Sequence, residues 1–450
     1  MAATAVALQE KGFTVTGSDE NVYPPMSTFL AERGLTVFNG YKESNLAEAP
    51  DLVVVGNALS RGNPEVEAIL EKKLHYCSLP ELLKEFFIRG KRSIVVAGTH
   101  GKTTTTSLLT WVFEHNGLNP SYMIGGIPTN LGQGARFTDS PWFIIEGDEY
   151  DTSFFDKRSK FVHYLPEVAL INNLEFDHAD IFENLAAIQT SFKRLIQLIP
   201  RNGLLLANGD EPNLSGMLDI KHCPVQRFGL GAPNDRQATS LQLRSDESSF
   251  QLQGETYTIP LIGELNVRNA LAVAACAIHC GLAPSQIQSA FQTFLGIKRR
   301  MEVRGEPDGI AIVDDFGHHP TAIRETLIAL RIKYPNRLLW AVFEPRSNTT
   351  RRNVFQSELA DALKLADASV VAQVARLELL KPSDRLDPDR LIQELRATGR
   401  PAAYLPDANT IAQHLLTESR TGDVICIFSN GGFGGLHEKL IKGLSSRAQS

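Results

Sequence analysis

The segment Gly98–Thr104 constrains the fold of this chain most, because it sets a glycine-rich loop between an apolar run and a helical pattern. The run Ser93–Ala97 predicts a buried strand, and Ser107–Glu114 predicts a helix. Glycines let backbone N–H groups turn toward phosphate oxygens, and the helix start adds partial positive charge. Lys102 can neutralise β- and γ-phosphates, and the Thr103 hydroxyl can bind Mg²⁺. This order predicts a nucleoside triphosphate site in an α/β fold.

The loop is a shorter variant of the usual phosphate-binding pattern. Strict spacing would require glycine at position 96, where this chain has Val96. An ordinary glycine-rich turn is the alternative, and the preceding strand, the Lys-Thr pair and the following helix together favour phosphate binding. The residues that we predict to contact the nucleotide here are Gly98, Thr99, His100, Gly101, Lys102, Thr103 and Thr104.

Acidic residues follow the next apolar run and can supply a metal ligand. Phe143–Ile145 predicts a strand that ends at Glu146, and ligands of open α/β folds lie at the carboxyl ends of strands. Mg²⁺ needs only one or two carboxylates, so we predict Glu146 as its ligand and a solvated role for Asp151. A further strand, Val168–Ile171, leads to Asp177 and His178. That pair can hold a second metal, contact the γ-phosphate, or serve only a structural role.

The chain divides into three α/β units. Continuous apolar runs such as Leu52–Val55 suit strands buried on both faces, which predicts doubly wound parallel sheets with covering helices. Composition turns basic at Ile88–Lys91 and again at Gly296–Arg300, and strand–helix alternation restarts after each. We predict domains at residues 1–88, 89–297 and 298–450, in line with about 150 residues for each. A hairpin is predicted around Gly254, and a disordered tail at Ser445–Ser450.

Bulk properties exclude several classes of function. The net charge of −6 gives no basic surface for nucleic acid or an anionic membrane. Five scattered cysteines predict neither disulfides nor a zinc knuckle, and Cys276 and Cys280 fit a buried helix face better than a metal site. The longest apolar stretch, Ala270–Cys280, is too short to span a bilayer, and no signal sequence opens the chain. We expect a cytoplasmic protein with small substrates and no stable membrane contact.

The phosphate loop, the acidic strand end and the Asp-His segment together resemble the Mur ligase family, the ATP-dependent amide-forming enzymes of peptidoglycan synthesis. The resemblance covers nearly the whole chain in order, continuing through Gly263–Ala270, Lys298–Arg300 and Val313–Pro320. It implies a Rossmann-like N-terminal domain, a central P-loop ATPase domain and a C-terminal Rossmann-like domain. The Asp-Asp-aromatic-Gly-His-His-Pro run is similar to the branch that acts on UDP-N-acetylmuramate.

Within that branch, further segments resemble members that attach the tripeptide L-alanyl-γ-D-glutamyl-meso-diaminopimelate in peptidoglycan recycling. L-Alanine-adding members tend toward F-Q-P-H-R-Y-T-R where this chain has Phe343–Thr350. The resemblance therefore implies UDP-N-acetylmuramate and the tripeptide as substrates, with free L-alanine as the alternative. The segments that carry it are Gly17–Asp19, Tyr23–Thr28, Gly56–Ala58, Ser60–Pro64, Glu149–Thr152, Phe154–Lys160, Phe343–Thr349 and Ser429–Gly435.

The same resemblance implies roles for individual residues. ATP and Mg²⁺ are expected at Lys102, Thr103, Glu146 and His178, with Asn173, Asn266, Arg300 and Asp315 also at the nucleotide, Asn266 by the adenine and Asp315 by the ribose. The residues expected near ATP or the incoming peptide are His318, His319 and Arg346, and those on the UDP-sugar side are Ser18, Asp19 and Asn130.

Two features depart from the family pattern. Some members carry a carbamylated lysine after the Asp-His segment, and Lys193 lies in that neighbourhood, although a surface lysine fits its spacing better. The chain also begins at a predicted helix, Ala2–Gln9, without the strand and glycine turn that open family members. Loss of a central strand leaves ladder groups unpaired at about 1–3 kcal/mol each, so we expect a natural start upstream of Met1.

The implied chemistry is activation of a carboxylate by ATP. Phosphorylation would give an acyl-phosphate, which the peptide amine attacks, and a general base must keep that amine neutral. His318 and His319 are the candidates for this base, and Lys102 and His178 complete the predicted catalytic set. A P-loop hydrolase or nucleotide-gated binding protein is the alternative from another class, and the Asp315–Pro320 run speaks against it.

Overall fold

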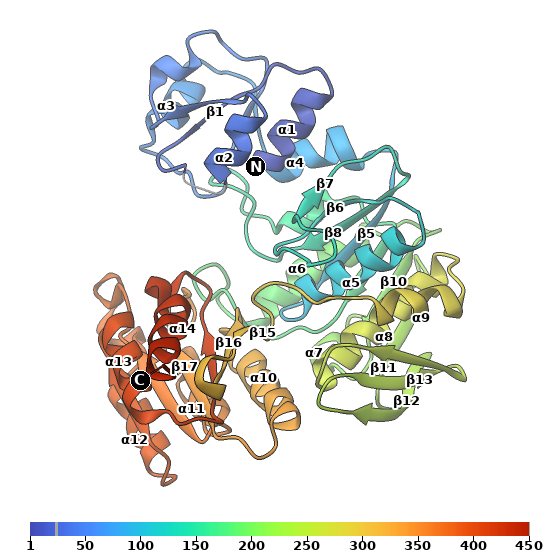
Figure 1. The fold of residues 1–450 in the computed structure, drawn as a ribbon. Helices are drawn as coiled ribbons and strands as arrows, with labels where there is room; N and C mark the ends of the chain where they lie inside the picture. The colour runs from blue at the N-terminus through green and yellow to red at the C-terminus, as the bar shows by residue number, and fades with distance from the viewer. Residues whose placement is uncertain (23–25, 450) are drawn as a thin grey trace.

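The computed structural model describes residues 1–22 and 26–449, and it consists of three α/β parts in chain order (Figure 1). The first part is drawn in blue, the second runs from teal to yellow, and the third is orange to red. The predicted α/β class is therefore confirmed. The proposed boundaries near residues 88 and 297 fall between the sheets of successive parts.

The N-terminal part contains two separate parallel sheets of two strands each, β1–β2 and β3–β4. Both pairs are parallel, as predicted, but the expected burial of Leu52–Val55 on both faces is wrong, because only Val55 of this run is buried. In the part of the chain that the structure describes, residues 1–22 and 26–449, neither pair is hydrogen-bonded to a third strand. The elements are α1 (Ala2–Glu10), β1 (Thr16–Asp19), α2 (Met26–Glu32), β2 (Thr36–Asn39), β3 (Val53–Val55), α3 (Pro64–Glu71), β4 (Tyr76–Ser78) and α4 (Leu79–Leu83). Tyr23–Pro25 lie outside the described residues.

The central part is built on a ten-stranded sheet in the order β14-β13-β12-β11-β10-β9-β5-β8-β6-β7. Strand β5 lies between β9 and β8, and its side chains alternate between two cores. Ile94 and Val96 pack with the helices α5 and α8, whereas Val95 and Ala97 pack on the other face with α6. The strands are β5 (Arg92–Ala97), β6 (Ser121–Met123), β7 (Ala135–Arg136), β8 (Trp142–Gly147), β9 (Val168–Ile171), β10 (Leu204–Asn208), β11 (Val225–Gly229), β12 (Arg236–Leu243), β13 (Ser248–Leu252) and β14 (Glu255–Ile259).

Helices cover both faces of the central sheet, as the buried runs predict. They are α5 (Lys102–His115), α6 (Leu185–Gln197), α7 (Pro212–Ser215), α8 (Glu264–His279) and α9 (Pro284–Gln292). The hairpin predicted around Gly254 is confirmed as the antiparallel pair β13–β14. Cys276 is fully buried on α8, in agreement with the predicted helix face.

The C-terminal part has a six-stranded sheet in the order β15-β16-β20-β17-β18-β19, parallel except for β15. The predicted disordered tail is wrong for Ser445–Arg447, because α14 extends to Arg447 and packs Leu440 and Leu444 into the core. The elements are β15 (Glu302–Gly305), β16 (Ala311–Asp315), α10 (Pro320–Lys333), β17 (Leu339–Phe343), α11 (Gln356–Leu363), β18 (Ala368–Ala372), α12 (Pro388–Arg396), β19 (Ala402–Leu405), α13 (Ala408–Glu418), β20 (Val424–Phe428) and α14 (Leu436–Arg447).

The carboxyl ends of strands from two different sheets meet between the central and C-terminal parts. Strand β5 ends at the loop that begins with Gly98, and β16 ends at Asp315. Side chains after β9 contact side chains after β17, for example Asp177 with Thr349. Among the residues that the structure describes, no helix is long and apolar enough to cross a membrane.

Candidate active site

Two glycines of the loop after β5 are fixed by their surroundings. Gly98 has φ 138° and Gly101 has φ 75°, values that side-chain-bearing residues rarely adopt. A Cβ on Gly98 would lie 3.1 Å from the backbone of Asn173, and one on Gly101 would lie 2.5 Å from Asn269 Oδ1. Helix α5 then begins at Lys102, so its free N–H groups face the loop. This is the geometry that the sequence predicts for a phosphate cradle.

The Lys102 side chain lies beside this loop, is 11% exposed, and donates to two acceptors. Its Nζ donates to the carbonyl of Gly98 at 2.7 Å and to Glu149 Oε2 at 2.8 Å. Burial opposes its charge, but the carboxylates of Glu149 and Asp148 raise the pKa of Lys102 above its ordinary value. The ammonium is therefore charged and held in place before any phosphate arrives.

Glu146 and Thr103 lie together as predicted for a metal site. The Thr103 hydroxyl donates to Glu146 Oε1 at 2.9 Å, and the amide of Gly125 donates to Glu146 Oε2 at 2.7 Å. Burial and the neighbouring charge of Asp148 raise the pKa of Glu146. Two crowded carboxylates beside a hydroxyl form an all-oxygen donor set, which is what Mg²⁺ prefers, and a divalent cation would relieve their repulsion. The residues present therefore fit this ion.

His178 joins the site through Glu149, which sequence reasoning had not singled out. Glu149 is 2% exposed and accepts from Lys102 at one oxygen and from His178 Nε2 at the other, at 3.1 Å. Burial works against the charge of His178, but this hydrogen bond raises the pKa of His178. The imidazole thus contacts Glu149 and not the Glu146–Thr103 pair. The acidic run after Ile145 was the available signal for Glu149.

Asp177 connects the central and C-terminal parts. The Thr349 hydroxyl donates to Asp177 Oδ1 at 2.8 Å, and His318 Nε2 lies 3.8 Å from Oδ2. Burial disfavours its charge, but the imidazoles of His318 and His178 hold the pKa of Asp177 far below its usual range. Burial lowers the pKa of His318 despite this carboxylate, so its imidazole is neutral near pH 7. A neutral, 24% exposed imidazole beside a carboxylate can accept a proton.

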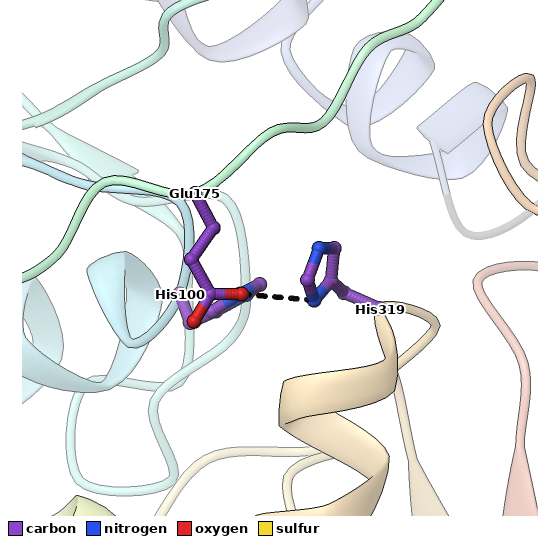
Figure 2. A group of neighbouring side chains, drawn as sticks. All are labelled: His100, Glu175 and His319. Atoms are coloured by element: carbon purple, nitrogen blue, oxygen red, sulfur yellow. Dashed lines mark hydrogen bonds and ion pairs between the residues drawn. The ribbon is translucent and has the colours of Figure 1, made fainter. Parts of the chain in front are cut away.

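His100 and His319 meet at Glu175, which bridges the same two parts (Figure 2). The His100 Nε2 lies 3.2 Å from Glu175 Oε2, His319 Nδ1 lies 3.4 Å from the same oxygen, and the two rings are 4.3 Å apart. These are ligand types that can hold a metal ion. His319, however, is already bonded at both nitrogens, to the Thr321 amide and the Phe176 carbonyl. We therefore interpret the cluster as a hydrogen-bonded joint between the two parts.

A cleft beside the loop is lined by Asn173 and Asn269 but not by Asn266, the residue predicted at the adenine. Asn266 instead donates to the carbonyl of Ile262 at 2.9 Å, at the start of α8. Asn269 lies three positions later, about one turn along α8, and so reaches the cleft. The Asn-x-x-Asn spacing was the signal that sequence reasoning left unused. Other side chains that line the cleft are His100, Glu175, Asn208, Phe228, Arg268, Thr321 and Glu325.

Arg300 and Asp315 lie where the C-terminal part begins. The Arg300 guanidinium donates to the Thr103 hydroxyl at 3.1 Å, which places it at the loop as predicted. Asp315 accepts from the amides of Met301 and Gly317 at 2.8 and 2.7 Å. Burial raises the pKa of Asp315, and both its oxygens hold the backbone of the connection. A ribose contact at Asp315 stays a prediction.

The remaining predicted residues lie away from this cluster. Asp19 is exposed and Ser18 half-buried at the end of β1, and Ser18 accepts from Asn45 at 3.2 Å. The Asn130 amide is bonded on both sides to the backbone of Thr293 and Leu295, at 2.8 and 2.7 Å. The two Asn130 contacts anchor the loop that carries it. The sugar-nucleotide roles of Ser18, Asp19 and Asn130 stay predictions.

Arg346 and Lys193 are on the surface. Arg346 is 54% exposed after β17, and its guanidinium lies where a Cβ on Gly431 would clash, at 2.5 Å. The Ser429–Gly435 loop and the turn after β17 therefore pack against each other. Lys193 is exposed on α6, which suits a surface lysine better than a metal bridge.

Sequence profiles of one family match nearly all of the chain. The Mur ligase middle domain matches residues 96–277, the Mur ligase glutamate ligase domain residues 299–431, and the Mur ligase family catalytic domain residues 1–91.

Individual relatives match over the full length. The chain is 42% identical over 454 residues to the UDP-N-acetylmuramate–L-alanyl-γ-D-glutamyl-meso-2,6-diaminoheptandioate ligase of Escherichia coli K12, covering 100% of this chain and 97% of the relative. It is 32% identical to the UDP-N-acetylmuramate–L-alanine ligase of Geobacter sulfurreducens, covering 96% and 92%. The crystal structure of a murein peptide ligase from Psychrobacter arcticus superposes with a TM-score of 0.73 and 36% identity, covering 99% of this chain and 96% of that one.

Proposed function

Because this chain belongs to the Mur ligase family, it is an ATP-dependent ligase that forms amide bonds, and we propose that it is a murein peptide ligase. In this proposal it joins L-alanyl-γ-D-glutamyl-meso-diaminopimelate to the lactyl carboxylate of UDP-N-acetylmuramate. The carrying observation is the full-length likeness to the Escherichia coli tripeptide ligase, which exceeds the likeness to the L-alanine ligases. The segment Phe343–Thr350 supports the same choice, since it differs from the L-alanine pattern.

We assign ATP to the loop between Gly98 and Thr104, with its base in the cleft beside Asn269. Mg²⁺, held by Thr103 and Glu146, would neutralise phosphate oxygens when it is bound. Lys102 would exchange its contact with Gly98 for the phosphates and keep its ion pair with Glu149. The backbone amides of the loop and of the first turn of α5 would bind the remaining phosphate oxygens.

In the first step, a lactyl carboxylate oxygen attacks the γ-phosphorus. A new P–O bond forms, the bond to the β-phosphate oxygen breaks, and ADP leaves with that electron pair. Lys102 stabilises the charge that builds on the transferred group, and Arg300 is close enough to assist. The product is an acyl-phosphate, whose carbonyl carbon is a far better electrophile than that of a carboxylate.

In the second step, the amine of the tripeptide's L-alanine attacks that carbonyl. The C–N bond forms, the C–O bond to phosphate breaks, and the amine must lose a proton. We assign this proton to His318, because its imidazole is neutral, half-buried and adjacent to Asp177. His319 is less suited, since both of its ring nitrogens are already bonded.

Closure of the C-terminal part onto the central part would keep water from the acyl-phosphate. The contacts Thr349–Asp177 and Asn348–Asp180, at 2.8 and 2.6 Å, already hold the two together. Exclusion of water matters because the intermediate would otherwise hydrolyse. We place the reaction in the cytoplasm, where ATP and UDP-sugars are available.

The test is ADP release by the purified full chain with ATP, Mg²⁺ and UDP-N-acetylmuramate, offering tripeptide and free L-alanine in parallel. Tripeptide is expected to give the larger kcat/KM. Mass spectrometry should detect the product in which the tripeptide is joined to UDP-N-acetylmuramate. A larger kcat/KM with L-alanine would replace the proposal by the L-alanine ligase activity. ADP release without either amine would instead indicate a simple nucleotide hydrolase.

A further inference from the structure

Lys160 is held beside the acidic end of β8 by the backbone. Its amide donates to the carbonyl of Tyr150 at 3.2 Å, and the amide of Phe161 donates to the carbonyl of Asp148 at 3.4 Å. A bridge between Asp151 and Ser159 extends this pairing. Phe161 is fully buried and anchors the segment. The lysine is therefore positioned by backbone hydrogen bonds on both sides of it, which makes its location a fixed feature of the fold.

The ammonium group of Lys160 lies inside the site but is poorly satisfied. Its Nζ is 3.6 Å from Asp148 Oδ2 and 3.9 Å from the centre of the Tyr150 ring. The side chain is only 18% exposed, compared with 70% for Lys157 three residues earlier. Within residues 1–22 and 26–449, no hydrogen bond from this ammonium group is present. One carboxylate oxygen at 3.6 Å and one aromatic face do not satisfy three N–H groups, so donors of this ammonium stay available.

Lys160 and Lys102 contact different carboxylates of the acidic cluster. Lys102 contacts Glu149, whereas Lys160 contacts Asp148. The ring of Tyr150 packs 5.4 Å from that of His178, which connects Lys160 with the rest of the site.

Lys160 also faces the N-terminal part. Burial and the nearby charge of Lys160 lower the pKa of the Met1 α-amino group, so the start of α1 lies close by. Figure 1 shows this end of α1 next to the central part. Lys160 therefore lies between the acidic cluster and the part to which the sugar nucleotide is assigned.

A carboxylate substrate meets an electrostatic obstacle here. Glu146, Asp148 and Glu149 all carry acidic groups at the place where an acid must be phosphorylated, and like charges repel strongly in a partly buried site. Lys102 is already bonded to Glu149 and Gly98, and Arg300 is bonded to Thr103. Of the side chains of Lys102, Arg300 and Lys160, that of Lys160 is the one that makes no hydrogen bond within the described residues.

We propose that Lys160 binds the carboxylate that is to be phosphorylated and holds it beside the acidic cluster, while Lys102 binds the phosphates. This inference rests on the proposed function, because it takes the sugar nucleotide's lactyl group as that carboxylate. Lys160 thereby selects an acidic sugar nucleotide over a neutral one. One charged hydrogen bond of this kind corresponds to about tenfold or more in affinity.

The experiment compares two UDP-sugars that differ only in the lactyl group, UDP-N-acetylmuramate and UDP-N-acetylglucosamine. Calorimetry on the full chain, with Mg²⁺ and a non-hydrolysable ATP analogue, measures the affinity of each for wild type, K160M, K160R and K157M. Wild type and K157M are expected to prefer UDP-N-acetylmuramate by about tenfold or more. K160M should bind both within about twofold, and K160R should keep part of the preference.

Retention of the full wild-type preference by K160M would overturn the inference, as would a wild type that binds both sugars equally. Steady-state kinetics provide a second readout: KM for UDP-N-acetylmuramate should rise in K160M while KM for ATP stays within about twofold. If thermal unfolding shows that K160M does not fold, the test uses K160R instead. A K160R variant with wild-type preference between the two sugars and wild-type KM for UDP-N-acetylmuramate contradicts the inference. A wild type that prefers L-alanine to tripeptide would refute the proposed function alone and leave the role of Lys160 standing.

Discussion

The N-terminal and central parts of this molecule use the same alternation of strand and helix, but their sheets differ. In the central part, β5 has a hydrogen-bonded strand on each side, and Ile94, Val95 and Val96 are fully buried. In the described residues of the N-terminal part, the strands form two separate pairs, and most residues of β1 and β2 are exposed. The central sheet is thus a rigid frame, while the N-terminal pairs depend on few neighbours.

This difference in packing separates the residues that we assign to chemistry from those that we assign to binding of the sugar nucleotide. The residues that hold charge in fixed positions lie at or just beyond the carboxyl ends of the interior strands β5 and β8; they are Lys102, Glu146 and Glu149. The N-terminal residues assigned to the sugar nucleotide, Ser18 and Asp19, lie on a small sheet with little core of its own. Regions with few buried contacts open at lower free-energy cost. The comparison therefore predicts large catalytic effects in the central part and smaller binding effects in the N-terminal part.

The largest effect is expected for Lys102→Ala, which removes the charge that we assign to phosphate binding. Turnover should fall by about 10²–10³-fold or more, since a charge aimed at the transition state is lost. Circular dichroism should show the protein still folded. The matched N-terminal variant, Ser18→Ala, should raise KM for the sugar nucleotide by only a few-fold and leave kcat nearly unchanged. More than a few per cent of wild-type turnover in Lys102→Ala would contradict the assignment of the loop.

The next effect concerns stability. Leu170→Ala empties a fully buried position on β9 and should lower the free energy of unfolding by about 2–5 kcal/mol. Val54→Ala, at a half-buried position on β3, should cost about 1 kcal/mol. Chemical denaturation followed by fluorescence measures both. Equal losses would show that the N-terminal sheets are as tightly packed as the central one.

A smaller effect is expected in the pH dependence of kcat. His318 must be neutral to accept a proton, and burial lowers its pKa, so the acidic limb of the profile should lie below about pH 6.5. Asp177 opposes this lowering. Asp177→Asn removes the opposing charge and should move the limb to still lower pH. A limb that moves to higher pH in this variant would exclude His318 as the base.

The smallest effect is expected for Lys193→Ala. Lys193 is exposed on α6, so the variant should keep turnover within about twofold of wild type and leave stability within about 0.5 kcal/mol. As a control, the turnover of wild type is measured with and without added bicarbonate, because bicarbonate would raise turnover if it depended on a carbamylated lysine. A large loss of turnover would bring back a metal-bridging role for this residue.

Local sequence signals recovered much of the fold and part of the site. The loop at Gly98, the hairpin at Gly254 and the proximity of Glu146 to Thr103 were all predictable, because each depends on a short segment or on neighbouring strand ends. Asn269 lines the cleft and Asn266 does not. Because residues three apart share a helix face, this difference depends on how far along α8 the cleft reaches, and the adenine contact of Asn266 stays a prediction. The joint at Glu175 was missed, because it needs residues from two parts of the chain.

The sequence by itself determined that a phosphate loop follows a buried strand, that the chain is α/β, and that its motifs are those of one ligase family. Glycine at positive φ, continuous apolar runs and strand-end acids act over a few residues, so they are readable without a structure. Only the tertiary structure decided that Glu149 links Lys102 to His178 and that Lys160 faces the acidic cluster. Those contacts depend on how separate segments pack, and burial then sets the charges that the chemistry uses.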